Sequence, residues 1–314
     1  MNVGNRLTPL PKAGVRGVER ARAYGSSYDA RMSDVAEIRS APSTEGLDEE
    51  ARGIVEGLYG EGIIARKGAF STDWADQLNT DVLAAFEEAR QREGGAVSRG
   101  PNRFYVEVHP EQLRGFVDLV SHPWVTTVCE TVLGPDYEIV EIGFDIPFAG
   151  AKDQPWHRDF PSPPETYEQG RLTSLAFNIT TVDTTEDMGP FNISLGTQFE
   201  SGVDFDHQQF PDRSEWPRYE AGSVYKTPQR GDISARSALT IHRGTANRSE
   251  LARPVVVLGV DAPGAGHDEL HDMMVTRAFH ESLPPELRRH LHARVVDELV
   301  PIVQKHDIEG LVMG

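Results

Sequence analysis

The chain of 314 residues has a single cysteine, so it can form no intramolecular disulfide. This suits a reducing compartment, and we expect a cytoplasmic protein in which Cys129 packs as a small hydrophobic side chain. Long apolar runs are also missing, because no stretch approaches the ~18 residues that a membrane-spanning helix needs. The N-terminus lacks the apolar segment of a secretory signal. We therefore expect no membrane partner.

Basic residues are scarce relative to acidic ones. The sequence has 31 Lys and Arg against 49 Asp and Glu, which gives a formal net charge of -18 at pH 7. A surface this acidic repels phosphate backbones, so a nucleic-acid partner is not expected. It also disfavours anionic membrane surfaces and bulky polyanionic substrates, although a local basic pocket could override the overall charge.

Glycine and proline are present in number, with 29 and 21 residues, and they favour a strand-rich, loop-rich body over a helical bundle. Short apolar runs alternate with Gly/Pro turns in the middle of the chain, as in a β-sandwich or barrel. These runs lie at 137–148, 174–183, 189–194, 231–237, 238–244 and 253–262. The expected fold class is mainly β with flanking α-helices.

The same patterns predict the domain organisation. Residues 1–45 lack a sustained apolar period, and we expect a flexible N-terminal arm there. Residues 46–314 are expected to form a single domain. It comprises a lead-in of helices and strands over 46–136, a β core over 137–262 and C-terminal helices over 263–314.

Capping signals place several helices. Ser71 is a good N-cap for a helix that begins at residue 72. Prolines at the first helical position predict a helix over 110–120 and another over 123–133. A long helical pattern opened by two prolines predicts a further helix over 284–306.

The most specific chemical feature is the segment PWHRDF at 155–160. On an extended strand, residues two apart point to the same face, so His157 and Asp159 would converge on one point. His242 lies at the end of another strand-like run and can supply a third ligand across a rolled sheet. Two histidines and one carboxylate form the facial triad that leaves open positions and suits oxygen-activating Fe(II).

Arg253 follows His242 by eleven positions, at the start of an apolar strand. Its guanidinium group offers a fixed fork for a carboxylate, which would suit one end of a dicarboxylic co-substrate. Each of these signals alone is weak, because His-x-Asp pairs and single histidines arise often by chance. Together, on predicted strands, they predict a metal site.

The sequence resembles the phytanoyl-CoA dioxygenase-like (PhyH-like) family of Fe(II)/2-oxoglutarate-dependent oxygenases. The matching segments are GIIARKGAFS from residue 62, QPWHRDF at 154–160, MGPFNISLGTQFE at 188–200 and GDISARSALTIHRGTANRSELARP at 231–254. The resemblance covers about residues 55–262 and implies a double-stranded β-helix (jelly roll, cupin-like). It implies Fe(II) held by His157, Asp159 and His242, with 2-oxoglutarate and O2 as co-substrates and Arg253 as the 2-oxoglutarate anchor.

The implied activity is hydroxylation of a C–H bond in a small-molecule substrate, with release of succinate and CO2. Desaturation, epimerisation and ring formation fit the same site. One departure affects the substrate side: the family's Pro-Gly-Ser-His ending stands here as SLGTQ at 194–198, so the resemblance carries over no substrate.

Further residues are candidates for the same pocket. Ser174 and Asn178 share one face of a strand and could contact the proximal carboxylate of 2-oxoglutarate, or only bond their neighbours. Five residues on or near the predicted strands are candidates for substrate contact: Arg103, Tyr105, Trp156, Arg158 and Phe160.

Other interpretations stay open. The chain could be a non-catalytic jelly-roll module that binds a small molecule, with a vestigial or structural metal site. A degenerate binder would be expected to lose a ligand, and this chain keeps all three together with Arg253. A cupin-type metal enzyme without 2-oxoglutarate would leave Arg253 without a role.

The segment HDELH at 267–271 resembles a zinc-protease helix, but Asp268 replaces the usual Glu and no third ligand is evident. On a helix His290 and His292 would face apart, so we expect them at the surface.

Overall fold

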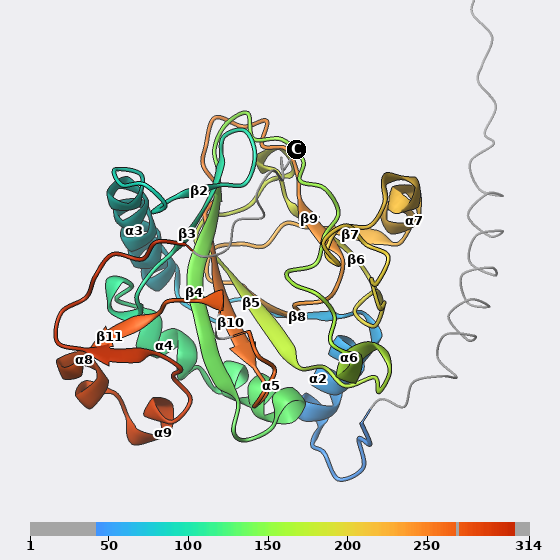
Figure 1. Cartoon of the computed structure of the whole chain (residues 1–314), viewed down its shortest axis with the longest axis horizontal. Coiled ribbons are helices and arrows are strands. Elements are labelled where there is room, and N and C mark those ends of the chain that lie inside the picture. Colours follow the sequence, from blue (N-terminus) through green and yellow to red (C-terminus); the bar gives the residue numbers. More distant parts are fainter. Residues whose placement is uncertain (1–41, 268–269, 305–314) are drawn as a thin grey trace, which may run out of the picture. The chain divides into compact units, whose positions relative to one another are not determined.

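The computed structural model describes residues 42–267 and 270–304 (Figure 1). The predicted N-terminal arm lies outside the described residues except for its last four. None of the described helices is both long and apolar enough to cross a membrane.

The larger of two facing sheets has seven strands. They are β1 (Ile63–Arg66), β2 (Val97–Ser98), β3 (Arg103–Glu107), β4 (Glu138–Pro147), β5 (Ser174–Thr180), β8 (Ile233–Ser237) and β10 (Val255–Asp261). Their order is β1-β8-β5-β10-β4-β3-β2, and every neighbouring pair is antiparallel. Strands far apart in sequence are therefore neighbours in the sheet, as in a jelly roll.

The smaller sheet has three antiparallel strands in the order β7-β6-β9. They are β6 (Phe191–Ser194), β7 (Ser223–Lys226) and β9 (His242–Gly244). Two antiparallel sheets with helices outside them confirm the predicted fold class, a mainly β jelly roll with flanking α-helices.

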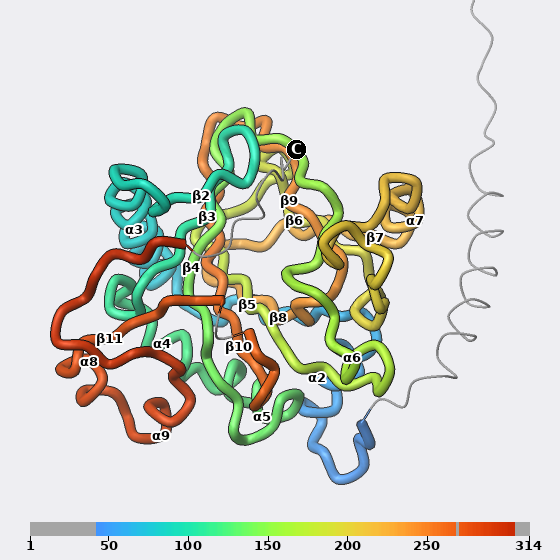
Figure 2. Tube along the Cα trace, in the orientation of Figure 1, coloured from blue at the N-terminus to red at the C-terminus, as the bar shows by residue number. Residues whose placement is uncertain are grey.

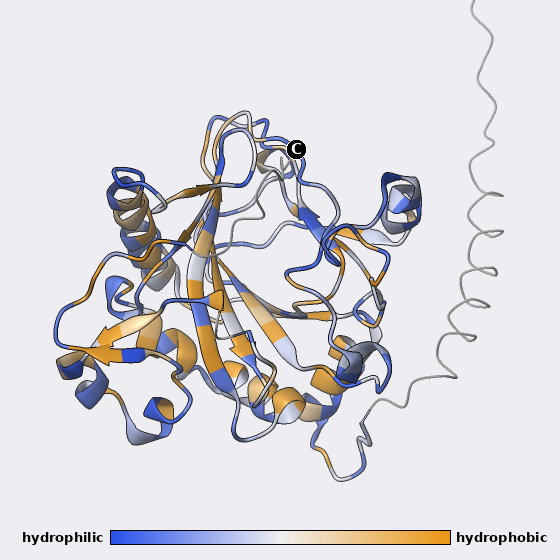
Figure 3. Cartoon of the chain, in the orientation of Figure 1, coloured by the Kyte–Doolittle hydropathy of each residue, from blue (hydrophilic) through white to orange (hydrophobic). Residues whose placement is uncertain are grey.

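Alternation along the strands of the larger sheet gives it two different faces. In β5, Leu175, Phe177 and Ile179 belong to the main hydrophobic core, whereas Ser174, Ala176 and Asn178 line a cavity. Figure 3 shows the same alternation as orange and blue segments along the central strands. Because successive strand residues point to opposite faces, the sequence places the apolar residues under the helices and the polar ones in the cavity.

Helices before β4 cover the apolar face of the larger sheet. They are α2 (Glu49–Gly60), α3 (Thr72–Ala89), α4 (Phe116–Val120) and α5 (Pro123–Leu133). The predicted cap of α3 is confirmed, because the Ser71 side chain accepts a hydrogen bond from the backbone N–H of Trp74. The predicted bounds of α5 are confirmed as well, and Cys129 is buried within it.

The single helix predicted over 110–120 was wrong. The segment contains the 3-10 turn η1 (Pro110–Gln112) and then α4, with Gly115 between them. A Cβ at Gly115 would lie 2.7 Å from Nε1 of Trp74, so the chain passes too close to this ring for any side chain. Short elements between the later strands are α6 (Pro164–Tyr167), η2 (Glu186–Met188), η3 (Arg213–Glu215) and α7 (Trp216–Ala221).

The long helix predicted over 284–306 was also wrong in the part that the structure describes. After β11 (Met274–Thr276) and α8 (Arg277–Ser282), that region holds the short helix α9 (Pro285–Arg288) and the strand β12 (Arg294–Val296). The backbone of Ile139 bonds to His290 O and to the N–H of His292, so Leu291 forms a parallel bridge with Ile139 instead of continuing a helix. His290 is buried and stacks on Tyr137, which corrects the predicted surface position. Figure 2 shows this orange and red segment beside β4 and α4.

Side chains anchor β11 to the end of β3. Glu107, His109 and Glu111 accept hydrogen bonds from the backbone N–H groups of Asp272, Met274 and Thr276, at 3.0, 3.1 and 2.8 Å. Alternate residues on one segment thus bond alternate residues on the other. This ladder holds the C-terminal segment against the larger sheet.

Candidate metal centre and its cavity

Two histidines far apart in sequence lie on adjacent, hydrogen-bonded backbone. The N–H of His157 donates to His242 O at 3.0 Å, and the N–H of His242 donates to His157 O at 2.8 Å. His242 begins β9, but His157 forms only this isolated bridge and the chain bends at Asp159. The extended strand expected for 157–159 is therefore a single bridge followed by a bend.

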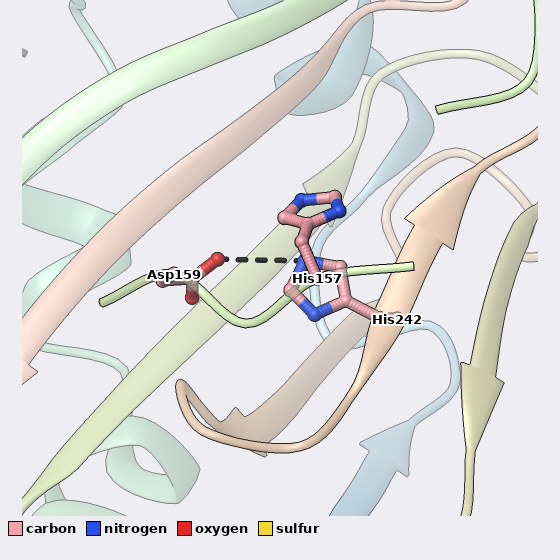
Figure 4. Close-up of side chains that lie close together, drawn as sticks. All are labelled: His157, Asp159 and His242. Atoms are coloured by element: carbon pink, nitrogen blue, oxygen red, sulfur yellow. Dashed lines mark ion pairs between the residues drawn. The ribbon is translucent and has the colours of Figure 1, made fainter. Parts of the chain in front are cut away.

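The three predicted metal ligands converge despite the bend (Figure 4). One ligand atom each from His157, Asp159 and His242 lies within 4.8 Å of the others. The distance between His242 Nε2 and Asp159 Oδ1 is 3.4 Å. No other group of three or more His, Cys, Asp or Glu residues with this spacing occurs in the described parts of the chain.

Backbone carbonyls fix the orientation of both imidazoles. The Nδ1–H of His157 donates to Pro155 O at 2.8 Å, and the Nδ1–H of His242 donates to Thr240 O at 2.9 Å. Each ring therefore has Nε2 available as a lone-pair donor. A second ring nitrogen held in this way is typical of metal-binding histidines.

Electrostatics keep the triad in the protonation states that a cation needs. Burial is the main cause that lowers the pKa of His157, and burial with Arg236 holds the pKa of His242 well below its usual range. Burial alone would raise the pKa of Asp159, but Arg236 and the histidines outweigh it and lower that pKa. At neutral pH the site offers two neutral imidazoles and one carboxylate, a donor set that fits Fe(II).

Arg236 on β8 is a residue of this site that the sequence analysis missed. Its Nη1 donates to Asp159 Oδ2 at 2.7 Å, and its Nη2 donates to Oδ1 at 3.3 Å. The signal was present in the alternation of ISARS, which places Ser234 and Arg236 on the cavity face and buries Ile233 and Ala235. Without the register of β8 beside the bend, nothing indicated that Arg236 would contact Asp159.

The triad opens into a cavity of about 960 Å³ on the polar face of the larger sheet. Its lining includes Arg103, Tyr105, Phe160, Ser174, Asn178 and Arg253, in addition to the triad. The structure therefore gathers most of the predicted site residues around one space. Their individual positions differ from the predictions in several cases.

One end of the cavity is basic. Arg253 and Arg103 are both buried, and burial followed by the neighbouring Arg103 lowers the pKa of Arg253 to about 10. The Arg253 Nε donates to Met188 O at 3.2 Å, while Arg103 pairs with Asp145 at 2.8 Å and donates to Thr245 O at 2.9 Å. Two guanidinium groups with one carboxylate leave an excess positive charge, which suits an anionic group.

Asn178 and Ser174 lie at different distances from that end. The register pairs Thr180 with Val255, Asn178 with Val257, and Ser174 with Asp261. Ser174 is thus six residues, about 20 Å, along the sheet from the Arg253 end. Its Oγ contacts His267 Nδ1 at 3.0 Å. Asn178 lines the cavity nearer to that end, and its amide Nδ2–H groups are the donors that the predicted contact with 2-oxoglutarate requires.

Farther along the cavity wall, where Glu141 pairs with Gly259, a polar cluster includes the hydroxyl group of Tyr105. The Tyr105 hydroxyl donates a short hydrogen bond to Glu141, and His271 lies 3.8 Å from Glu141 and 3.6 Å from Glu107. Gly143 makes room for the pair, because a Cβ there would lie 2.8 Å from Tyr105 Cζ. Tyr105 was predicted from the sequence, whereas Glu141 was missed.

Of the remaining residues predicted to contact the substrate, two reach the cavity lining and one does not. Phe160 lines the cavity and stacks on His267 at a centroid distance of 3.6 Å. Arg158 reaches the lining, but its Nη1 donates to Glu200 O at 2.8 Å. The pocket-lining position predicted for Trp156 was wrong, because this side chain is fully buried in a separate small core with Tyr219. Trp156 directly precedes His157 in the chain, and its side chain points to the opposite side of the backbone.

The two histidines of HDELH do not form the zinc-protease arrangement. Residues 268–269 lie outside the described residues, and His267 and His271 are not in an α-helix. His267 Nδ1 lies 3.1 Å from Asp261 Oδ2, whereas His271 belongs to the cluster around Glu141. The acidic atoms nearest to the two side chains differ, and among the described residues neither histidine belongs to a group of three or more potential metal ligands.

Solved structures share this fold. EctD from S. alaskensis with 2-oxoglutarate and 5-hydroxyectoine matches with a TM-score of 0.56 and 18% identity, over 71% of this chain and 80% of that chain. Its apoform matches with a TM-score of 0.54 and 17% identity, over 72% and 81%. The chain therefore has the jelly-roll fold of the cupin-like 2-oxoglutarate oxygenases. No curated protein matches it.

The family comparison goes further than the fold. The phytanoyl-CoA dioxygenase (PhyH) family matches residues 60–255, a stretch that contains the triad and Arg253. The chain belongs to this family. This confirms the resemblance that the sequence motifs indicated.

Proposed function

We propose that the protein is an Fe(II)- and 2-oxoglutarate-dependent dioxygenase that hydroxylates a C–H bond of a small molecule and releases succinate and CO2. The observation that carries the proposal is the convergence of His157, Asp159 and His242 in the same cavity as the buried Arg253. A binding module without catalysis would have no need for both features. Membership of the PhyH family and the fold shared with 2-oxoglutarate-bound EctD support it.

Each residue has a defined task in this proposal. His157 Nε2, a carboxylate oxygen of Asp159 and His242 Nε2 hold Fe(II), which supplies O2 activation when it is bound. Arg253 binds the distal carboxylate of 2-oxoglutarate through its guanidinium fork. Arg103, held by Asp145, adds positive charge at the same end. Asn178, which lines the cavity, donates from its amide Nδ2–H to the proximal carboxylate.

The test is anaerobic titration of Fe(II) with and without 2-oxoglutarate, monitored by the visible charge-transfer band of the chelate. The parent is expected to form the band. His157→Ala should lose it, because the chelate needs the metal. Arg253→Met should form it only at a much higher 2-oxoglutarate concentration, by about tenfold to a hundredfold, since a charged hydrogen-bond pair contributes about 1.5–3 kcal/mol.

Two controls separate these roles from general damage. His280→Ala removes an imidazole on α8 that is remote from the cavity lining, and Arg243→Met removes a buried arginine that contacts Trp156 and Glu220. Both should titrate like the parent. A parent that binds neither Fe(II) nor 2-oxoglutarate would contradict the proposal and favour a binding module instead. Succinate release then serves to screen candidate substrates.

A further inference from the structure

The two oxygens of the Asp159 carboxylate have different partners. Oδ2 accepts the shorter bond from Arg236 Nη1, at 2.7 Å, whereas Oδ1 lies 3.4 Å from His242 Nε2 on the side of the histidines. The second Arg236 bond, from Nη2 to Oδ1, is longer at 3.3 Å. One oxygen is thus held by the arginine and the other faces the two imidazoles.

Arg236 is built into the cavity wall. Its side chain is 5% exposed, and its guanidinium carbon lies 5.6 Å from the centroid of Phe191, whose ring is 5.1 Å from the ring of His242. Its cross-strand neighbour on β5 is Ala176, which also lines the cavity. This small side chain leaves the path from β8 to Asp159 open. Phe191 therefore packs beside both the arginine and a triad histidine.

The geometry points to a role for Arg236 as a positioning residue: we propose that it restricts Asp159 to binding the metal through Oδ1 alone. This inference rests on the proposed function. A carboxylate can bind a divalent cation through one oxygen or two, and a second oxygen would take a position that the co-substrates need. By holding Oδ2, Arg236 leaves those positions to 2-oxoglutarate and O2.

Arginine is suited to this task in a way that lysine is not. Its planar fork contacts both oxygens of one carboxylate and so fixes the rotation of the group, whereas an ammonium ion acts as a point charge. Removal of a residue that orients a metal ligand typically lowers metal affinity by 10–100-fold. The same removal should alter the coordination of the metal, because the freed carboxylate can rotate.

The experiment uses Co(II) as a spectroscopic probe of the full-length protein. For the parent, Arg236→Met and Arg236→Lys, one measures the Co(II) dissociation constant, the visible Co(II) spectrum and the affinity of the Co(II) protein for 2-oxoglutarate. Arg236→Met should weaken Co(II) binding by about 10–100-fold and change the spectrum. It should also weaken 2-oxoglutarate binding, although Arg253 is intact. Arg236→Lys should restore part of the metal affinity while its spectrum still differs from that of the parent.

Arg243→Met is the matched control, because Arg243 is a buried arginine next to His242 that lies outside the cavity lining. It should leave the Co(II) spectrum unchanged. If Arg236→Met destabilises the fold, Arg236→Gln keeps one donor and serves in its place. If the Arg236 variants have the same spectra and affinities as the parent, the role of Arg236 is overturned while the metal site stands. The same holds if Arg243→Met changes the spectrum as much as Arg236→Met does. A parent without Co(II) or Fe(II) binding would overturn the metal site itself.

Discussion

Gly244 shapes the basic end of the cavity because it has no side chain. A Cβ at this position would collide with Arg103 Nη1 and lie 2.7 Å from Gln154 Oε1. The Gly244 N–H also donates to Gln154 Oε1 at 2.9 Å. Arg103 therefore reaches Asp145 and Thr245 only because the strand passes it without a side chain.

Gly244→Ala is expected to displace Arg103 and to raise the 2-oxoglutarate concentration needed for half-saturation by about tenfold. Fe(II) affinity should change little, since the histidine bridge precedes this residue. The measurement compares Fe(II) and 2-oxoglutarate titrations of the variant and the parent. Gly60→Ala on α2 is the control, because nothing lies within 4 Å of a Cβ there and the residue is not part of the cavity lining. Equal 2-oxoglutarate affinity in both variants would show that Arg103 tolerates the methyl group.

Prediction from the sequence succeeded where a residue's task follows from spacing. His157, Asp159, His242 and Arg253 were found in this way, and the structure brings them to one cavity. Their roles as ligands stay predictions. It failed for Trp156, because adjacent residues of an extended backbone point to opposite faces, so the neighbour of His157 points away from the cavity. The roles of Arg236 and Glu141 depend on strand register: alternation could place Arg236 on the cavity face, but it could not indicate which residue Arg236 would contact.

Among the elements, the C-terminal segment shows how tertiary pairing overrides helical periodicity. The pattern over 284–306 has the spacing of a helix, yet the helix ends in a turn and Leu291 forms a parallel bridge with Ile139. The helix α9 ends after a single turn. Local propensity is worth only tenths of a kcal/mol per residue, so a few long-range hydrogen bonds can reverse it.

The anchoring of β11 is expected to depend on pH through His109. Its Nδ1 accepts from Met274 N–H, and this bond needs the neutral ring, whereas its Nε2–H can donate to Val300 O in either protonation state. Burial is the main cause that lowers its pKa. The unfolded chain, with a pKa near 6.5, then binds a proton more readily than the folded one. His109 should thus cost stability as pH falls below about 6.5, by about 1.4 kcal/mol for each unit by which the pKa is lowered.

The measurement is urea unfolding of the parent and His109→Gln at about pH 7.5 and about pH 5.5, without metal. The parent should lose more stability than the variant between the two values. An equal loss would mean that the segment does not depend on the neutral ring. A smaller loss of stability in the parent would mean that the folded state binds the proton on His109 more tightly than the unfolded state does.

At the scale of the whole molecule, the fold class was predictable because apolar and polar residues alternate along strands that have one face on the core and one on the cavity. Short apolar runs between glycines and prolines predicted strands such as β5 and β10. The pairing of distant strands came from the family resemblance, since no local pattern specifies which strand lies beside which. Within one sheet of that topology, the sides of β3, β4, β5, β8 and β10 that face away from the main core form the cavity wall.

Ligands of the folded state should raise the stability of the whole protein by mass action. At a concentration 100 times the dissociation constant, one ligand contributes about 2.7 kcal/mol. Co(II) followed by 2-oxoglutarate should therefore raise the Tm in two steps. Arg253→Met should keep the first step and lose most of the second, and His157→Ala should lose both. A second step that survives in His157→Ala would place 2-oxoglutarate away from the metal.

The backbone bridge between His157 and His242 has a consequence for how the site forms. The two imidazoles become neighbours only when the segment before the bend pairs with β9, so no local fragment of the chain can assemble the triad. Metal affinity should thus appear in a single step with global folding. During denaturation the loss of bound metal would coincide with the loss of tertiary structure, and the ion would act as a reporter of folding cooperativity.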